Sequence, residues 1–124
     1  MKLEHIAIAV NNSSEIKNFY KGLLGMEEVR SFILNERLSQ KIFGIPKETP
    51  ITLLEKDDLV LEVFILYEPL KKGYNHICFA VDDREELVKM ALMNNYELTR
   101  IERDSSDLIF VKDHSGNIYE VKEK

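Results

Sequence analysis

Three histidines, His5, His76 and His114, are the only imidazole side chains in this chain of 124 residues. The first two each open an apolar run, whereas His114 precedes Ser115 and Gly116 in a polar turn. Metal binding or acid–base chemistry that needs imidazole near neutral pH must use these residues. We therefore take His5 and His76 as candidate metal ligands and interpret His114 as an exposed turn residue.

Two glutamates complete the candidate set because each stands inside an otherwise apolar strand. Glu62 lies within Val60–Phe64, and Glu120 lies within Ile118–Val121. An ionised carboxylate there is costly unless a positive charge pairs with it, and a divalent cation would supply that charge. Two imidazoles and two carboxylates suit Ni, Mn, Fe, Co or Zn, with two coordination positions left for water or substrate. The alternative for Glu62 is a solvent-facing residue on an edge strand.

The elements that would position these residues repeat along the chain. His76–Val81 corresponds to His5–Val10 at an offset of 71 residues (76 − 5), and both alternate large and small side chains as a two-faced strand does. Each histidine shares its strand face with small residues, so we expect its side chain to project into open space. A helix pattern follows each strand, over 16–24 with a stop at Gly25 and over 84–93.

Three strand patterns follow each helix. They fall at 28–34, 51–54 and 59–66 in the first half, with a helical turn or irregular stretch at 38–43, and at 98–103, 108–111 and 118–121 in the second half. A repeated unit too small to bury a large core is expected to pack against its copy. The sequence therefore predicts an α+β fold of tandem βαβββ modules, at about 1–68 and 74–124 with a linker at 69–73, forming a single domain over 1–124.

Composition narrows the classes of function. With 44% hydrophobic and 31% charged residues the chain is typical of a globular protein, and its net charge of −5 argues against nucleic acid or an anionic membrane as a partner. A single cysteine, Cys78, excludes an intrachain disulfide and a thiolate zinc cluster, which is typical of the cytoplasm. No apolar stretch approaches the roughly 20 residues that span a bilayer. We interpret Cys78 as a small buried hydrophobic residue.

Taken together, four motifs are similar to those of the glyoxalase/bleomycin-resistance/extradiol-dioxygenase superfamily, also called the vicinal oxygen chelate superfamily. The motifs span nearly the whole chain and lie at His5–Val10, Phe19–Met26, His76–Asp83 and Asp113–Glu120. The resemblance implies that the two modules form a cupped, half-barrel mixed sheet with a metal in the cup, in a homodimer. By position, the four metal-ligand places of the family correspond to His5, Glu62, His76 and Glu120.

The carboxylate at Glu62 makes the resemblance closest to glyoxalase I. It implies a metal-dependent lyase or isomerase that chelates two neighbouring oxygens of a small carbonyl compound or thiol adduct and stabilises an enediolate. One glutamate ligand would act as the base, with Glu120 ranked ahead of Glu62. Glutathione stays open as a co-substrate, because its contacts are matched only by residue type, at Arg30, Arg37, Arg100 and Arg103.

The same resemblance leaves two alternatives. One is a ring-cleaving dioxygenase or a transferase that uses only His5, His76 and Glu120 as ligands. The other, of a different class, is a metal-free protein that sequesters a small molecule, as bleomycin-resistance proteins do. A complete set of four ligands favours the enzyme over the binding protein.

Overall fold

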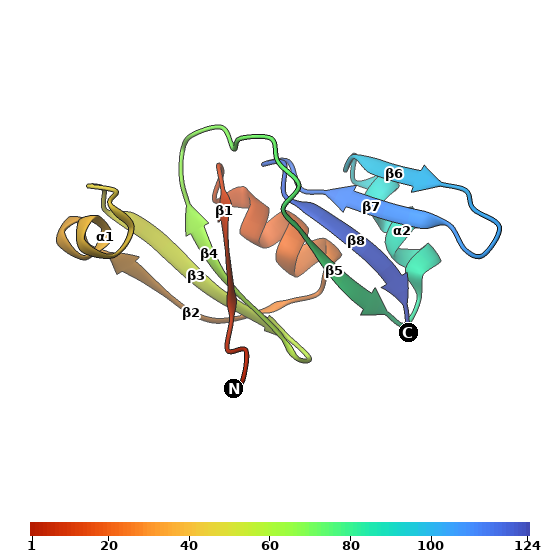
Figure 1. Ribbon diagram of the computed structural model, residues 1–124, viewed down its shortest axis with the longest axis horizontal. Coiled ribbons are helices and arrows are strands. Elements are labelled where there is room, and N and C mark those ends of the chain that lie inside the picture. Colours follow the sequence, from red (N-terminus) through yellow and green to blue (C-terminus); the bar gives the residue numbers. More distant parts are fainter. The chain divides into compact units, whose positions relative to one another are not determined.

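The two repeats of the sequence fold into two separate four-stranded sheets. The computed structural model describes residues 1–124, which divide into Met1–Pro69, here called the N-unit, and Leu70–Lys124, the C-unit. The strand orders are β1-β4-β3-β2 in the N-unit and β5-β8-β7-β6 in the C-unit (Figure 1). The predicted order of strand, helix and three strands is therefore confirmed in both halves, as is the α+β class.

The N-unit begins with a strand and a helix and continues with three further strands. Its elements are β1 (Ile6–Val10), η1 (Ile16–Leu23), β2 (Glu27–Leu34), α1 (Glu36–Phe43), β3 (Thr49–Lys56) and β4 (Leu59–Ile65). β1 pairs with β4 in parallel, and the other two pairings are antiparallel. The stretch at 38–43, for which the sequence left a helical turn or an irregular segment open, belongs to the helix α1. The Asn35 side chain caps the start of α1 by accepting a hydrogen bond from the Leu38 amide.

The helix η1 is wound as a π-helix. Leu24 N–H donates to the carbonyl of Phe19, five residues earlier, at 2.9 Å. Its apolar side chains are buried, at Ile16, Phe19, Tyr20 and Leu23. The predicted amphipathic helix is thus confirmed, although the spacing of apolar residues did not distinguish π from α winding.

The C-unit repeats the arrangement without a helix between its second and third strands. Its elements are β5 (His76–Val81), α2 (Arg84–Met93), β6 (Leu98–Ile101), β7 (Leu108–Lys112) and β8 (Ile118–Glu123). β5 pairs with β8 in parallel, as β1 does with β4. The Asp83 side chain caps α2 by accepting from the Glu86 amide at 2.9 Å. β6 ends two residues earlier than predicted, where Arg103 turns its guanidinium Nε to the Ser106 carbonyl.

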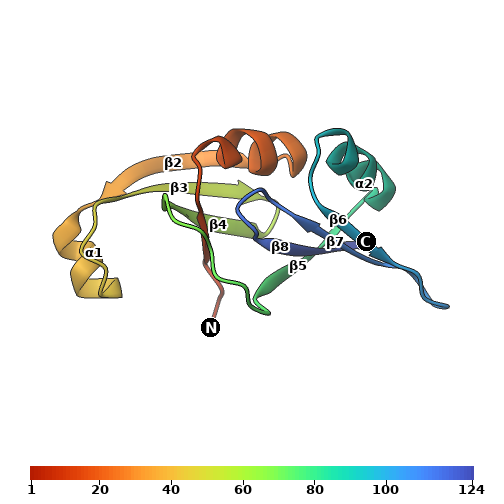
Figure 2. The same cartoon turned by 90° about the horizontal axis from the view of Figure 1, so that it is seen from above.

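Each sheet has one face covered by a helix and one open face. In Figure 2, η1 lies along one face of the N-unit sheet, and α2 along one face of the C-unit sheet. Side chains toward the helix are buried, such as Leu61 and Val63 on β4 and Tyr119 and Val121 on β8. The intervening side chains point to the opposite face, which we call the open face. No helix in the structure is long and apolar enough to cross a membrane.

Candidate functional site

The N-unit brings its histidine and its glutamate together on the open face. His5 directly precedes β1, and Glu62 lies mid-way along β4, paired with Ala7 in the parallel ladder. The His5 Nε2 and Glu62 Oε2 atoms are 3.8 Å apart, with the Glu62 side chain only 20% exposed. Because β4 lies between β1 and β3, the interpretation of Glu62 as a residue of an edge strand is wrong.

The C-unit reproduces this pair. His76 is the first residue of β5, and Glu120 lies on β8, paired with Cys78. The His76 Nε2 and Glu120 Oε2 atoms are again 3.8 Å apart. The same parallel pairing of first and last strands therefore places an imidazole next to a carboxylate in each repeat.

A backbone hydrogen bond orients the His76 ring. Its Nδ1–H donates to the carbonyl of Tyr74 at 2.9 Å, since a carbonyl oxygen can only accept. This bond leaves the lone pair on Nε2, the nitrogen that faces Glu120, which is the tautomer that a metal-ligating histidine needs. Sequence reasoning missed this contact, because a main-chain carbonyl leaves no signature in residue type.

The chemistry and spacing of each pair fit a divalent metal ion. Two donor atoms that each lie about 2.0–2.2 Å from one ion are at most about 4.4 Å apart, and the observed 3.8 Å separations fall inside that limit. Both carboxylates lie in strands between apolar neighbours, where a cation would offset the cost of their charge. Neither unit gathers three or more His, Cys, Asp or Glu side chains by itself. Each unit thus offers two ligands.

Cys78 lies on the open face beside Glu120. The thiol is exposed rather than buried, so the interpretation of Cys78 as a buried hydrophobic residue is wrong. The reason is that no helix covers the face of β5 to which its side chain points. Partial desolvation, with a smaller effect from the negative charge of Glu120, raises the pKa of the Cys78 thiol.

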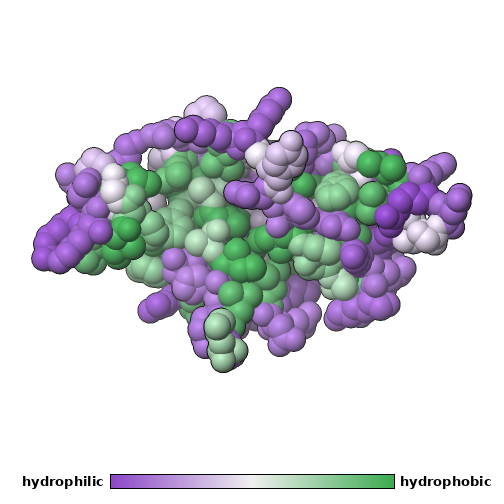
Figure 3. All heavy atoms as spheres, in the orientation of Figure 1, coloured by the Kyte–Doolittle hydropathy of each residue, from purple (hydrophilic) through white to green (hydrophobic).

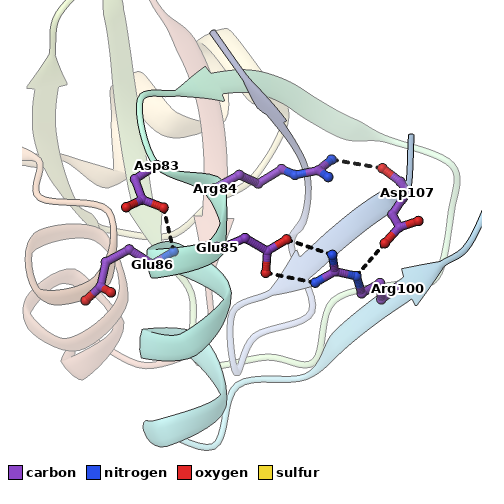
Figure 4. Close-up of polar contacts among 6 residues, drawn as sticks. All are labelled: Asp83, Arg84, Glu85, Glu86, Arg100 and Asp107. Carbon is purple, nitrogen blue, oxygen red and sulfur yellow. Dashed lines mark hydrogen bonds and ion pairs between the residues drawn. The ribbon is translucent and has the colours of Figure 1, made fainter. Parts of the chain in front are cut away.

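The arginines considered for glutathione binding have different surroundings. The Arg100 guanidinium donates to both carboxylate oxygens of Glu85, at 2.7 and 3.0 Å, and to the Asp107 carboxylate at 2.7 Å (Figure 4). These charge-assisted bonds lower the pKa of Glu85 and of Asp107. Arg100 thus joins α2 to β6 and to the loop before β7. Arg30 instead lies on the open face of the N-unit, with its guanidinium carbon 5.1 Å from the ring centroid of Phe32.

His114 is an exposed turn residue, as predicted. Its ring stacks on Tyr96 with centroids 4.5 Å apart, and its Nε2 lies 3.3 Å from the carbonyl oxygen of Asn95. The turn itself is held by the buried Asp113 carboxylate, which accepts from the amides of Ser115 and Asn117. His114 belongs to the connection between β7 and β8 and takes no part in either His–Glu pair.

Comparison with known proteins gives consistent matches over the whole chain. The model of the Glyoxalase/Bleomycin resistance protein/Dioxygenase superfamily matches residues 2–121. The chain is 30% identical to the mitochondrial methylmalonyl-CoA epimerase of Dictyostelium discoideum, over 99% of this chain and 78% of that protein.

Solved structures share the fold at lower identity. The trypanothione-dependent glyoxalase I of Leishmania major is 22% identical, with a TM-score of 0.75 over 99% of this chain and 86% of that one. A mutant of the fosfomycin resistance protein FosX from Listeria monocytogenes, complexed with Mn(II) and 1S,2S-dihydroxypropylphosphonic acid, is 17% identical. Its TM-score is 0.74, over 99% of this chain and 92% of that one.

Proposed function

The chain belongs to the glyoxalase/bleomycin resistance protein/dioxygenase superfamily, and we propose that it is a metal-dependent isomerase or lyase of the glyoxalase type. Its substrate is a small carbonyl compound with a second oxygen on the neighbouring carbon, or an acyl thioester with a second oxygen that can reach the same ion. Its reaction begins with loss of a proton from the carbon next to the carbonyl. The observation that carries the proposal is the same His–Glu pair, with the same 3.8 Å separation, on the first and last strands of both units.

The residues proposed to hold the metal are His5, Glu62, His76 and Glu120. Imidazole and carboxylate donors suit Ni, Zn, Mn, Co or Fe, and four protein ligands leave two of six coordination positions for substrate oxygens. When bound, the ion supplies Lewis-acid stabilisation of the negative charge that develops on those oxygens.

The proton transfer is assigned to a glutamate. Glu120 takes the proton from the reacting carbon, with Glu62 as the second candidate. Each carboxylate stands opposite a small residue, Cys78 beside Glu120 and Ala7 beside Glu62. A small neighbour leaves room above the sheet for a substrate carbon to approach the carboxylate oxygen. The His76 ring is held by the Tyr74 carbonyl and so keeps its Nε2 directed toward Glu120 during the transfer.

Two substrate types fit this chemistry. A hemithioacetal, formed from a 2-oxoaldehyde and a thiol such as glutathione, would be isomerised to a hydroxyacyl thioester. An acyl thioester such as methylmalonyl-CoA would be epimerised by loss of the proton on the reacting carbon and addition of a proton to the opposite face of that carbon. The 30% identity to a methylmalonyl-CoA epimerase favours the thioester, since the likeness to glyoxalase I, at 22% identity, extends to the fold alone.

The experiment that tests this function is proton exchange in D2O, followed by NMR. Protein loaded with Ni²⁺ or Co²⁺ is incubated with methylmalonyl-CoA and, separately, with the hemithioacetal of methylglyoxal and glutathione. Deuterium entering the carbon next to the carbonyl of either compound supports the proposal. A His114→Ala variant, which leaves both His–Glu pairs intact, should exchange at the rate of the unaltered protein. Metal-loaded protein that exchanges neither substrate would refute the proposed reaction for these classes.

The proposal also includes a homodimer of one-domain chains. Light scattering of the purified protein measures the oligomeric state directly. A chain of 14.5 kDa should elute with a mass of about 29 kDa, twice the chain mass, if it is a dimer. A monomer of full activity would contradict this part of the proposal without affecting the chemistry.

A further inference from the structure

A lysine lies beside the Glu120 carboxylate on the open face of the C-unit. Lys122 follows Glu120 by two residues on β8, and side chains two residues apart project from the same face of a strand. The Glu120 Oε2 atom faces His76, whereas its Oε1 atom lies 3.9 Å from the Lys122 Nζ atom. The ammonium group is therefore next to the second oxygen of the carboxylate to which the proton transfer is assigned.

The structural repeat does not require a lysine at this position. In the N-unit, Ala9 is paired with Phe64, whereas in the C-unit the equivalent Ala80 is paired with Lys122. The two His–Glu pairs thus have the same separation but different surroundings, because an aromatic ring in one unit is replaced by a positive charge in the other. A function of Lys122 therefore concerns the C-unit pair alone.

Stability of the sheet does not explain Lys122. Its side chain is 63% exposed, and 3.9 Å is longer than a hydrogen bond, so its contact with Glu120 is a weak surface ion pair. Lysines often protect an edge strand from pairing with another chain, but β8 lies between β5 and β7. Lys112 on β7 differs from Lys122, because its ammonium donates to the Glu97 carboxylate at 2.9 Å.

The charge of Lys122 becomes available to a ligand when Glu120 binds a metal. A cation on Glu120 compensates the carboxylate, which leaves the ammonium without a paired anion. The chain has a net charge of −5, so an anionic ligand needs a local positive charge to bind. Figure 3 shows hydrophobic residues among hydrophilic ones over the C-unit, and Phe110 is paired with Glu120 in the ladder. Apolar neighbours lower the local dielectric constant, which strengthens the attraction between unlike charges.

We propose that Lys122 binds a carboxylate attached to the reacting carbon of the substrate, which makes Lys122 a specificity-determining residue. The inference rests on the proposed function, because it places the reacting carbon at Glu120. One carboxylate oxygen is the second substrate oxygen that reaches the ion, and the other accepts a hydrogen bond from the ammonium. The reacting carbon of methylmalonyl-CoA carries such a carboxylate, whereas that of the hemithioacetal carries no charged group. The substrate class is therefore an acyl thioester with a carboxylate on the carbon that loses the proton.

Binding of two hydroxamates tests the proposal without any turnover. Malonomonohydroxamate and its carboxamide analogue have the same size and the same metal-chelating group, but one ends in a carboxylate and the other in a neutral amide. Calorimetry gives their Kd values on the Ni²⁺-loaded unaltered protein and on the Ni²⁺-loaded variants. The ratio of the two Kd values, here called the charge preference, isolates the contribution of the carboxylate.

The variants separate a contact with Lys122 from a general effect of positive charge. Lys122→Met should reduce the charge preference roughly 3- to 10-fold, because it removes one charge-assisted hydrogen bond. Lys122→Arg keeps the charge and should keep most of the preference. Lys112→Met is the matched control, because it removes the same charge from the neighbouring strand, where the ammonium is already bonded to Glu97. Its charge preference should equal that of the unaltered protein.

Failure of the inference and failure of the proposed function give different results. If both hydroxamates bind and the charge preference is the same in Lys122→Met as in the unaltered protein, Lys122 does not bind the carboxylate, and the proposed function stands. If Lys112→Met loses as much of the preference as Lys122→Met, the effect is a general one of charge, which also overturns the inference. If neither hydroxamate binds the metal-loaded protein, the proposed chelation fails and this inference fails with it.

Discussion

At the scale of single residues, the four residues proposed to bind the metal form two His–Glu pairs of the same geometry. In each pair an imidazole Nε2 lies 3.8 Å from a carboxylate Oε2 that is at most 20% exposed. A contact between a neutral imidazole and a carboxylate in a partly exposed setting stabilises a fold only slightly. The recurrence of one arrangement in both units therefore points to a shared ligand rather than to stability.

Metal affinity should depend on His76 and not on His114. Loss of a direct ligand is expected to weaken metal binding by about 100-fold or more, since changes that only orient a ligand already cost 10- to 100-fold. Competition with a chromogenic chelator measures the Kd of His76→Ala and His114→Ala. Equal metal affinities of the two variants would show that His76 is not a metal ligand.

Replacing each glutamate in turn by glutamine tests which of the two carboxylates accepts the proton. Glutamine keeps an oxygen donor but accepts no proton near neutral pH, so Glu120→Gln should lower the deuterium exchange rate by about 10²- to 10⁴-fold while metal is retained. Glu62→Gln is the comparison and should lose less. A larger loss of exchange rate in Glu62→Gln than in Glu120→Gln would mean that Glu62 is the base. Full exchange in Glu62→Gln with metal bound would instead favour the three-ligand enzymes of the superfamily.

At the scale of elements, two contacts hold the helices in place. Arg100 joins β6 to α2 through Glu85 and to the loop before β7 through Asp107. At the end of η1, Gly25 adopts φ +70°, and the Lys56 ammonium donates to the Leu24 carbonyl at 2.8 Å. Both contacts involve a helix that packs on the sheet face opposite the open face.

The Arg100 contact should make stability depend on acid pH. Glu85 and Asp107 have lowered pKa values in the folded state, so their stabilisation is present above the unfolded values of 4.5 and 3.8 and is lost as the pH falls through the lower folded values. Arg100→Met should have a lower Tm than the unaltered protein at pH 7, and the difference should shrink below about pH 4. Arg37→Met, which removes the same charge from exposed α1, is the control. A difference that stays constant from pH 7 to pH 3 would contradict the assignment.

Gly25 is needed for its backbone conformation. A side chain at φ +70° costs about 1–2 kcal/mol, and a Cβ there would lie 3.1 Å from the Lys56 ammonium nitrogen. Chemical denaturation of Gly25→Ala should therefore show a free energy of unfolding lower by about that amount. Gly73→Ala, where nothing lies within 4 Å of an added Cβ, should stay within about 0.5 kcal/mol. Equal stability of the two variants would contradict the strain argument.

At the scale of the whole molecule, each unit carries two of the four residues proposed to bind the metal. One imidazole and one carboxylate are too few for a tight site of the metals considered, which take four or more ligands. Because two ligands are too few, we propose that both His–Glu pairs bind the same ion.

A shared ion predicts a stoichiometry of one metal per chain and a non-additive effect of ligand loss. Elemental analysis should find one ion per chain in the unaltered protein, and His5→Ala and His76→Ala should each lose most of it, because each removes a ligand of the same ion. Two independent sites would behave differently. Two ions per chain, with one retained in each single variant, would overturn the shared site.

The sequence by itself determined the elements and the reactive residues. The offset of 71 residues and the alternation of side chains located β5 and α2 to the residue, and the apolar context of Glu62 and Glu120 marked both as unusual. These features are local, since periodicity and residue type report which face of an element is buried. The same local signals placed His5 and His76 at the start of equivalent strands.

Only the tertiary structure decided which residues meet. Pairing of Ala7 with Glu62 and of Cys78 with Glu120 depends on the register between strands far apart in the sequence, and no local pattern encodes that register. The π winding of η1, the open surroundings of Cys78 and the contact of Phe43 with Phe64 have the same origin. Each depends on what packs against an element, and that is settled only when the whole unit has folded.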